Sequence, residues 1–207
     1  NLDTSYIEAI EVRSQDFEIV TRKELDVLLE HANSTFWRAF ISTLWSCGFR
    51  IEETLNISLK HVIEPHSTEQ DNKNFILKIA YSKNKYGENR NVEVLLETTN
   101  KYLAEWLKEY KSQDKITDDS PLFPISYAGC FKTIRNLGKK YLNKKIGLHT
   151  FRHSSATYWT SILSHAELCV MHGWAFSSKM PDVYIKRAGV TSNNKAVKLY
   201  EHIEMTG

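Results

Sequence analysis

Residues 148–157 read LHTFRHSSAT, and this stretch places a histidine and an arginine three positions apart at the start of an expected helix. Thr150 has the residue type of an N-cap for a helix over residues 151–163. Near that start, His149 and Arg152 can face a single ligand at the positive end of the helix dipole, where a phosphate oxygen is the natural partner. Taken alone, an H-x-x-R pattern is more often a capping histidine followed by a surface arginine.

A second segment, CGFRIEETL at residues 47–55, lies where two helices are expected to meet. Apolar residues recur at near-helical spacing before it, and Gly48 is placed to end that helix. A short helix over residues 51–57 then begins directly after Arg50. Glu53 follows three positions later, and by itself this spacing is typical of a surface ion pair.

Together these two segments resemble the first and second signature boxes of the tyrosine recombinases, the second almost residue for residue. The resemblance implies a mainly α-helical domain with a small three-stranded antiparallel β-sheet (α+β). It also implies that Arg50 and Arg152 are the two catalytic arginines. His149 would be the histidine of the second box, which accepts the proton of the nucleophile or holds the phosphate, and Glu53 the acidic residue that supports the site.

The third box of that family usually reads Leu-Gly-His, sometimes with tryptophan in place of the histidine, and a tyrosine follows after a short interval. Here MHGW at residues 171–174 precedes Tyr184 by such an interval. Because the glycine sets the register, the resemblance assigns Trp174 to the His/Trp position and Tyr184 as the nucleophile. His172 then belongs to the preceding helix, although a shift of one residue would exchange the two roles. Tyr158, inside the helix after the second box, is the weaker candidate for the nucleophile.

The family also carries a lysine on a β-hairpin between its first two boxes, often as Ser/Thr-Lys followed by a turn and an Arg-x-Val strand. The sequence SKNKYGENRNV at residues 82–92 fits that form. We favour Lys83 over Lys85 as the general acid, and the sequence leaves this choice open. Lysines on hairpins are common, so the assignment depends on the resemblance.

The resemblance implies a site-specific DNA recombinase or integrase. In that chemistry Tyr184 attacks a phosphorus atom of double-stranded DNA, forms a 3′-phosphotyrosyl bond and releases a 5′-hydroxyl, without a metal or a cofactor. The alternatives are a type IB topoisomerase-like strand transferase, a non-catalytic DNA-binding relative and a plain helical scaffold. The sequence SKMPD before the tyrosine is similar to integrases of archaea and of their viruses or plasmids.

Basic residues are concentrated in one part of the chain. The net charge of +2 over 207 residues is a weak signal for nucleic-acid binding. No acidic residue occurs between positions 120 and 165, where seven basic residues gather. We therefore expect one basic face, and a solvated helix face is the alternative explanation. The residues predicted to bind DNA are Lys132, Arg135, Lys139, Lys140, Lys144 and Lys145.

The remaining composition narrows the class of protein. No run of about 18 uncharged apolar residues occurs, and the first residues resemble neither a signal peptide nor a transit peptide. We therefore expect an intracellular protein that is cytoplasmic, nucleoid-associated or encoded by a virus or plasmid, with no membrane and no small-molecule substrate as partner. Three widely spaced cysteines, none in a C-x-x-C pair, indicate neither a disulfide framework nor a zinc site.

Local patterns predict the other elements. The capping box TRKE predicts a helix from Arg22 to His31. Strands are expected over residues 61–63, 75–81 and 91–95, and further helices over residues 102–110, 126–141, 166–172 and 193–203. The sequence places Pro181 and Tyr184 on a loop before the last of these helices.

The predicted domain organisation is simple. We interpret residues 1–20 as an N-terminal linker or extension and residues 21–207 as the catalytic domain. The DNA-clamping domain that precedes it in the family is not visible in the sequence. The resemblance further implies a homotetramer on DNA during synapsis.

Overall fold

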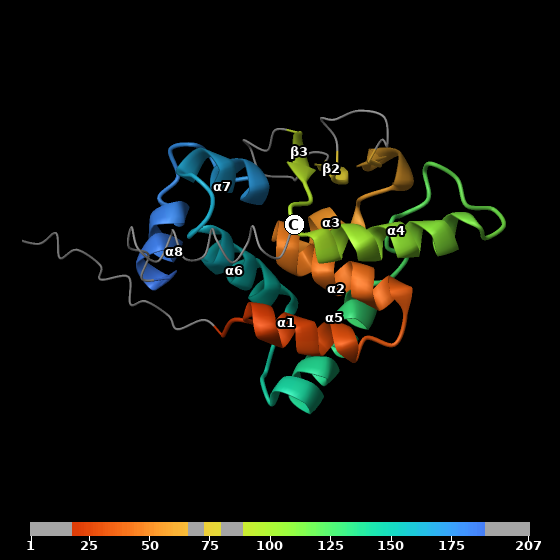
Figure 1. The fold of residues 1–207 in the computed structure, drawn as a ribbon, viewed down its shortest axis with the longest axis horizontal. Coiled ribbons are helices and arrows are strands. Elements are labelled where there is room, and N and C mark those ends of the chain that lie inside the picture. Colours follow the sequence, from red (N-terminus) through yellow and green to blue (C-terminus); the bar gives the residue numbers. More distant parts are fainter. Residues whose placement is uncertain (1–17, 66–72, 80–88, 189–207) are drawn as a thin grey trace, which may run out of the picture.

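A buried helix forms the centre of the protein. The computed structural model describes residues 18–65, 73–79 and 89–188. In α2 (Thr35–Cys47), every residue from Ala39 to the end of the helix is buried. The helices that pack against α2 are α1 (Arg22–Glu30), α4 (Glu97–Lys111) and α6 (Leu148–Trp159) (Figure 1). A helix buried on all sides is typical of a protein core.

The start of α1 and the end of α2 follow the sequence signals. Thr21 and Glu24 form the expected capping box, with the Thr21 backbone N–H donating to the Glu24 carboxylate at 2.9 Å. Gly48 ends α2 in the left-handed conformation, with φ of 60°. The short helix α3 (Ile51–Leu55) begins directly after Arg50, as expected.

The sheet is small and antiparallel, as predicted. Its strands are β1 (Val62–Ile63), β2 (Ile76–Ile79) and β3 (Arg90–Glu93), in the order β1-β2-β3. Leu77 and Val92 lie opposite each other and are both buried, so one face of the sheet packs on the core. Ile79, the last residue of β2, pairs with Arg90, the first residue of β3. Residues 80–88, which include Lys83 and Lys85, lie outside the described residues.

The other elements complete a mainly helical fold, which confirms the predicted class. A 3₁₀ turn, η1 (Leu59–His61), precedes the sheet. The second half of the chain adds α5 (Tyr127–Leu137), the π-helical turn η2 (Gly138–Leu142), α7 (His165–His172) and α8 (Met180–Ala188). In Figure 1, α6, α7 and α8 gather at one end of the molecule. The helix predicted over residues 193–203 lies outside the described residues.

Hydrogen bonds hold α6 against the C-terminal end of α2. The indole N–H of Trp159 donates to the backbone carbonyl of Ser46 at 2.6 Å, and the Ser155 hydroxyl donates to the same oxygen at 3.3 Å. The Ser154 hydroxyl accepts the backbone N–H of Val20 at 2.8 Å. These bonds fix the helix that carries the LHTFRHSSAT stretch relative to the end of α2.

Two predictions about helix boundaries were wrong. The helix α6 begins at Leu148, with Gly147 rather than Thr150 as its N-cap. Thr150 still caps the helix, because its hydroxyl accepts the backbone N–H of Gly147 at 3.0 Å from inside the first turn. Tyr184 lies on α8 and not on a loop. Pro181 occupies the first turn of that helix, where a missing N–H costs no hydrogen bond.

Gly48 offers a direct test of how tightly α2 meets its neighbours. We expect Gly48→Ala to lower the free energy of unfolding by about 2–4 kcal/mol, since it adds left-handed strain and overpacking. A Cβ there would lie 2.4 Å from Cε1 of His172 and 2.7 Å from the Ser155 hydroxyl oxygen. Urea unfolding measures the change.

Gly147→Ala is the control for that substitution. Nothing lies within 4 Å of a Cβ at residue 147, and its φ is −125°. Its cost should stay below about 1 kcal/mol. Equal losses from the two substitutions would contradict the close approach at Gly48.

Candidate active site

Arg152 joins the ends of two helices. From α6 it reaches the C-cap of α2, where its Nη1 donates to the Gly48 carbonyl at 2.7 Å, and the last residue of α7, where its Nη2 donates to the His172 carbonyl at 2.6 Å. Carbonyls at helix C-termini carry partial negative charge and suit a cation. Burial, followed by the charge of Arg50, lowers the pKa of Arg152 to about 10, so the group stays protonated at neutral pH.

Arg50 lies at the junction of α2 and α3, beside Glu53. Its backbone N–H donates to Oε2 of Glu53 at 2.8 Å, and its Nη1 donates to Oε1 at 3.1 Å. The Arg50 side chain keeps 29% of its surface exposed. A guanidinium carries five N–H donors. Among the described residues, the guanidinium of Arg50 makes one hydrogen bond, to Glu53, and its other donors are available to a ligand.

Arg90, at the start of β3, was not predicted as a site residue. It binds both carboxylate oxygens of Glu53, through Nη1 at 3.2 Å and Nη2 at 3.0 Å. Burial would raise the pKa of Glu53, but the hydrogen bonds and charge of Arg90, and then those of Arg50, hold it below its usual value of 4.5. Glu53 is thus a buried carboxylate shared by two arginines.

Gly173 allows the segment MHGW (residues 171–174) to lie close to Arg90. The glycine caps α7 with φ of 61°, and a Cβ there would lie 2.7 Å from Nη1 of Arg90. On another side, the Arg90 guanidinium lies 5.8 Å from the ring centroid of Phe49. The Arg-x-Val pattern of residues 90–92 marked this strand, but nothing local indicated these distant contacts.

Tyr184 is buried between two side chains from other elements. Its hydroxyl is hydrogen-bonded to Nδ1 of His153 at 2.7 Å, and its ring stacks on Trp174 with centroids 5.6 Å apart. Only 2% of Tyr184 is exposed. Burial raises the pKa of the phenol, although the charges of Arg152 and Arg187 oppose that shift. The phenol is therefore neutral at ordinary pH.

His153 was not among the predicted site residues, although it belongs to the quoted stretch. Burial, and then the charges of His149, Arg187 and Arg152, lower the pKa of His153. His149, which was predicted, lies one helical turn earlier on α6 and is exposed. The structure thus separates these two histidines by environment.

Trp174 and His172 have different surroundings. Trp174 is partly buried and lies over Arg152, whose guanidinium carbon is 5.6 Å from the indole centroid. His172 is fully buried as the last residue of α7, with its ring 4.6 Å from that of Trp174. Burial, and then the charge of Arg152, lower the pKa of His172 well below its usual value, so the ring is neutral.

The chain belongs to a known family. The model of the phage integrase family matches residues 18–188. This chain is a member of that family. The match contains every predicted site residue, including Lys83 and Lys85. No curated protein matches the chain.

Solved structures share the fold of this phage integrase family member. XerA recombinase is 22% identical with a TM-score of 0.66, and the match covers 89% of this chain and 63% of XerA. XerH bound to its difH substrate in a pre-cleavage complex is 20% identical with a TM-score of 0.61, covering 88% and 53%. A lambda integrase dimer bound to a COC' core site is 13% identical with a TM-score of 0.58, covering 81% and 47%. The chain thus spans about half to two thirds of these proteins.

Most of the predicted basic residues are exposed on α5, on η2 and just after it. Arg135 lies over the ring of Phe131 at 5.9 Å, and Lys140 over that of Tyr141 at 4.8 Å. Lys144 differs, because its Nζ donates to the Ile19 carbonyl at 3.0 Å and pairs with Glu24. The exposed members are Lys132, Arg135, Lys139, Lys140 and Lys145.

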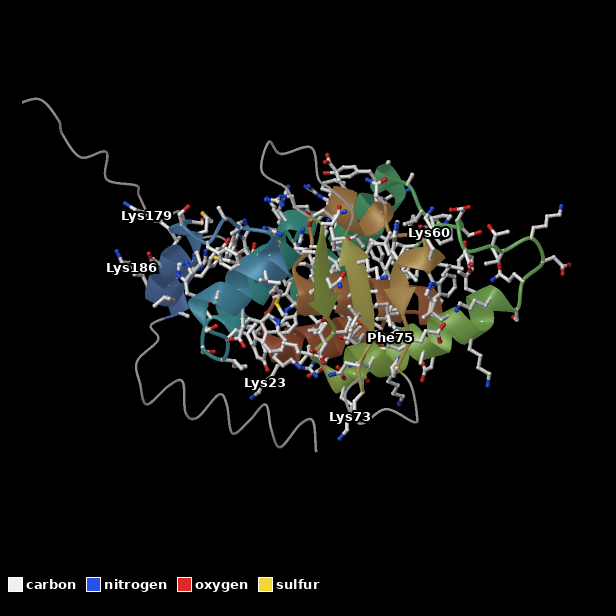
Figure 2. All side chains as sticks on the ribbon, turned by 90° about the horizontal axis from the view of Figure 1, so that it is seen from above. Lys23, Lys60, Lys73, Phe75, Lys179 and Lys186 are labelled. Atoms are coloured by element: carbon white, nitrogen blue, oxygen red, sulfur yellow. The ribbon has the colours of Figure 1, made fainter. Side chains whose placement is uncertain are left out.

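The α8 end of the chain carries further positive charge. Lys186 on α8 and Lys179 just before it project outward there (Figure 2).

Within the described ranges, no group of three or more His, Cys, Asp or Glu side chains could hold a metal ion, and no helix is long and apolar enough to cross a membrane.

Arg90 can be tested through the charge it compensates. We expect Arg90→Met to lower the free energy of unfolding by about 3–5 kcal/mol at pH 7, since it removes one partner of a buried carboxylate. The depressed pKa of Glu53 means that its contribution exists above pH 4.5 and is lost as pH falls below that value. The deficit of Arg90→Met should therefore shrink when urea unfolding is repeated below pH 4.5.

The matched control removes the unpaired charge. Arg90→Met combined with Glu53→Gln should regain part of the lost stability at pH 7, because no buried anion remains. A deficit that stayed constant with pH and was additive in the double variant would show that the contact contributes through packing alone.

Proposed function

We propose that residues 21–207 form the catalytic domain of a site-specific DNA recombinase, with residues 1–20 as an N-terminal linker or extension. It would cleave and rejoin strands of double-stranded DNA through a 3′-phosphotyrosyl intermediate. The observation that carries this proposal is the position of the Tyr184 hydroxyl, which is bonded to an imidazole beside the cation Arg152. The pre-cleavage and post-cleavage DNA complexes of XerH, a protein of the same fold, support it.

The two predicted arginines would bind the scissile phosphate. The Arg152 guanidinium donates one N–H to each of two carbonyls, and the Arg50 guanidinium donates one to Glu53. Because a guanidinium carries five N–H donors, both side chains would keep donors for the non-bridging oxygens. Such charge-assisted bonds strengthen as charge builds in the transition state. Removing one preorganised donor of this kind typically costs ~10² to 10³ in rate.

The remaining predicted residues would complete the reaction. Lys83, with Lys85 as the alternative, would protonate the departing 5′-oxygen. Trp174 would donate its indole N–H to a phosphate oxygen. The exposed His149, in the first turn of α6, would hold the phosphate where the helix dipole favours an anion. Glu53 would hold Arg50 in place.

Burial of the phenol implies a conformational step. Tyr184 is 2% exposed, so α8 would have to shift before the oxygen could reach a phosphorus atom. DNA binding would supply the energy for this shift, and the protein would act as a homotetramer on DNA inside the cell. The lambda integrase dimer on a core site supports assembly on DNA.

A suicide substrate tests the proposed reaction. We expect nicked DNA duplexes with a randomised core to trap the wild-type chain covalently. The short fragment that bears the released 5′-hydroxyl diffuses away after cleavage, so the strands cannot be rejoined. Tyr184→Phe should trap nothing, whereas Tyr158→Phe should trap normally. Gel shift under denaturing conditions measures the adduct.

The outcomes separate the competing functions. An adduct with Tyr184→Phe would refute the nucleophile, and specific binding without any adduct would indicate a non-catalytic relative. Relaxation of supercoiled plasmid by a monomer at any sequence would indicate a topoisomerase.

The exposed basic residues can be tested by their salt dependence. We expect Lys139→Ala with Lys140→Ala to weaken DNA binding across all sequences and to reduce the slope of log K against log salt by about 0.9 per lost phosphate contact. Lys60→Ala is the control, since Lys60 lies on η1, outside α5 and η2, and pairs with Asp119. Lys144→Met should lower stability more than affinity. Unchanged slopes in the double variant would exclude this surface from DNA binding.

A further inference from the structure

We infer that His172 is a positioning residue, whose buried ring fixes Arg152 and Trp174, two of the side chains proposed to bind the scissile phosphate. The ring acts through these two neighbours and contacts no reacting atom. This inference rests on the proposed function, because it concerns the groups that would hold the phosphate. It gives a role to a histidine that the sequence placed in the helix before the site.

His172 lies between the two helix ends that hold Arg152. Its own backbone carbonyl, at the end of α7, accepts Nη2 of Arg152 at 2.6 Å. Its ring faces the Gly48 backbone, since Nδ1 lies 2.7 Å from the position that a Cβ of Gly48 would occupy. The Gly48 carbonyl accepts Nη1 of Arg152 at 2.7 Å. The ring therefore helps to set the separation of the two carbonyls between which the guanidinium is held.

The same ring supports Trp174. The ring centroids of His172 and Trp174 are 4.6 Å apart, with the two planes inclined by 31°. Trp174 in turn lies over Arg152, at 5.6 Å from the guanidinium carbon, and stacks on Tyr184. Flat rings at such separations attract each other beyond the effect of the area that they bury. A branched aliphatic side chain at residue 172 would not reproduce this contact.

The ring of His172 has no hydrogen-bond partner among the described residues. The residue is 0% exposed, and neither Nδ1 nor Nε2 forms a hydrogen bond there. The Gly48 carbonyl favours a proton on the ring, but it does not lie in hydrogen-bond geometry. Buried polar atoms are nearly always paired, and an unpaired one costs stability that an apolar side chain would not lose. A feature that weakens the fold in this way is typical of a functional position.

The surrounding charges require a neutral ring. Burial, and then the charges of Arg152, Arg90 and Arg50, lower the pKa of His172 well below 6.5. These arginines come from α6, from β3 and from the junction of α2 and α3. Glu53 of α3 is the carboxylate that two of them share. A proton on the ring would add a further cation to this cluster and would compete with Arg152 for the Gly48 carbonyl.

The other titratable groups near the ring carry no charge that would stabilise an imidazolium. Burial raises the pKa of the Cys47 thiol, beside Gly48, to about 12, and it also raises the pKa of Cys169 on α7. From α8, the Tyr184 phenol is neutral because burial raises its pKa, and Arg187 adds a positive charge beside it. Protonation of His172 should therefore displace Arg152, just as loss of the ring should.

Two substitutions remove the ring but keep a side chain of similar size. We expect His172→Leu and His172→Gln to slow single-turnover formation of the Tyr184 adduct by ~10², because a misplacement of about 1 Å in such a site costs that much. Affinity for DNA should stay within a few-fold of wild type, because the exposed lysines are unchanged. His172→Leu should be at least as stable as wild type in urea, since it removes the unpaired nitrogens.

The position of Arg152 can be followed without DNA. A guanidinium held by two carbonyls rotates slowly, so NMR of ¹⁵N-arginine protein should resolve its Nη–H signals at pH 7. Arg152→Lys assigns these signals by their absence. We expect both His172 variants to broaden them, and we expect acid to broaden them in the wild-type chain.

The pH dependence of stability separates His172 from the other histidines. Because its pKa in the folded chain lies below 6.5, the unfolded chain takes up its proton first as pH falls. The equilibrium constant for folding should therefore fall below pH 6.5 by up to about tenfold per pH unit on account of this group. Both His172 variants should lose that part of the dependence, whereas His149→Gln, on the exposed surface of α6, should keep it.

Three results would each overturn the inference. They are adduct formation within a few-fold of wild type in both variants, sharp Arg152 signals in both variants, and pH-dependent unfolding that neither variant changes. A loss of rate that only parallels a loss of stability would also contradict it, because the ring would then serve the fold alone. If the wild-type chain forms no Tyr184 adduct on any substrate, the proposed function itself fails. The NMR and unfolding measurements would still decide whether His172 holds Arg152 in place.

Discussion

The buried guanidinium of Arg152 is the contact on which the arrangement of the site depends. It bonds the carbonyls of Gly48 and His172, which end α2 and α7, and it lies under the Trp174 ring. Burial of a cation is costly, and two helix C-terminal carbonyls together with Glu53 nearby offset that cost. Three segments that are distant in the sequence are therefore held together by one side chain.

The two glycines of these segments have a physical explanation. Gly48 and Gly173 both end helices in the left-handed conformation, and each lies where a Cβ would strike a neighbouring side chain. The neighbour of Gly48 is the His172 ring, and that of Gly173 is the Arg90 guanidinium. Each glycine thus allows one helix end to pack directly on a group from another segment. Contacts thus connect the segment of residues 47–55 to the segment of residues 171–174, and that segment to β3.

Much of the fold was predictable because its signals are local. The structure confirms the capping box before α1, the glycine after α2 and the three strands, and short motifs indicate the family. The predictions that were wrong concern residue types that occur in more than one position at a helix start. Thr150 caps its helix from inside the first turn, and Pro181 begins a helix where a loop was expected.

The candidate site was predicted less completely because its contacts are long-range. Arg90 meets Glu53 across 37 positions, and His153 meets Tyr184 across 31, so no spacing rule connects them. The charge pattern could not show that Lys144 is tied to Glu24 while its neighbours are exposed. Arg50, Arg152, Trp174 and Tyr184 gather as a group, but their catalytic roles stay predictions.

The identity of the nucleophile is the central claim, and mapping the covalent bond tests it most directly. Trapped protein would be digested with protease and nuclease, and the nucleotide-bearing peptide sequenced by mass spectrometry. The account predicts a 3′-phosphoryl nucleotide on Tyr184. A nucleotide on another residue, a 5′-linkage, or no linked peptide from DNA that the protein binds specifically would contradict it.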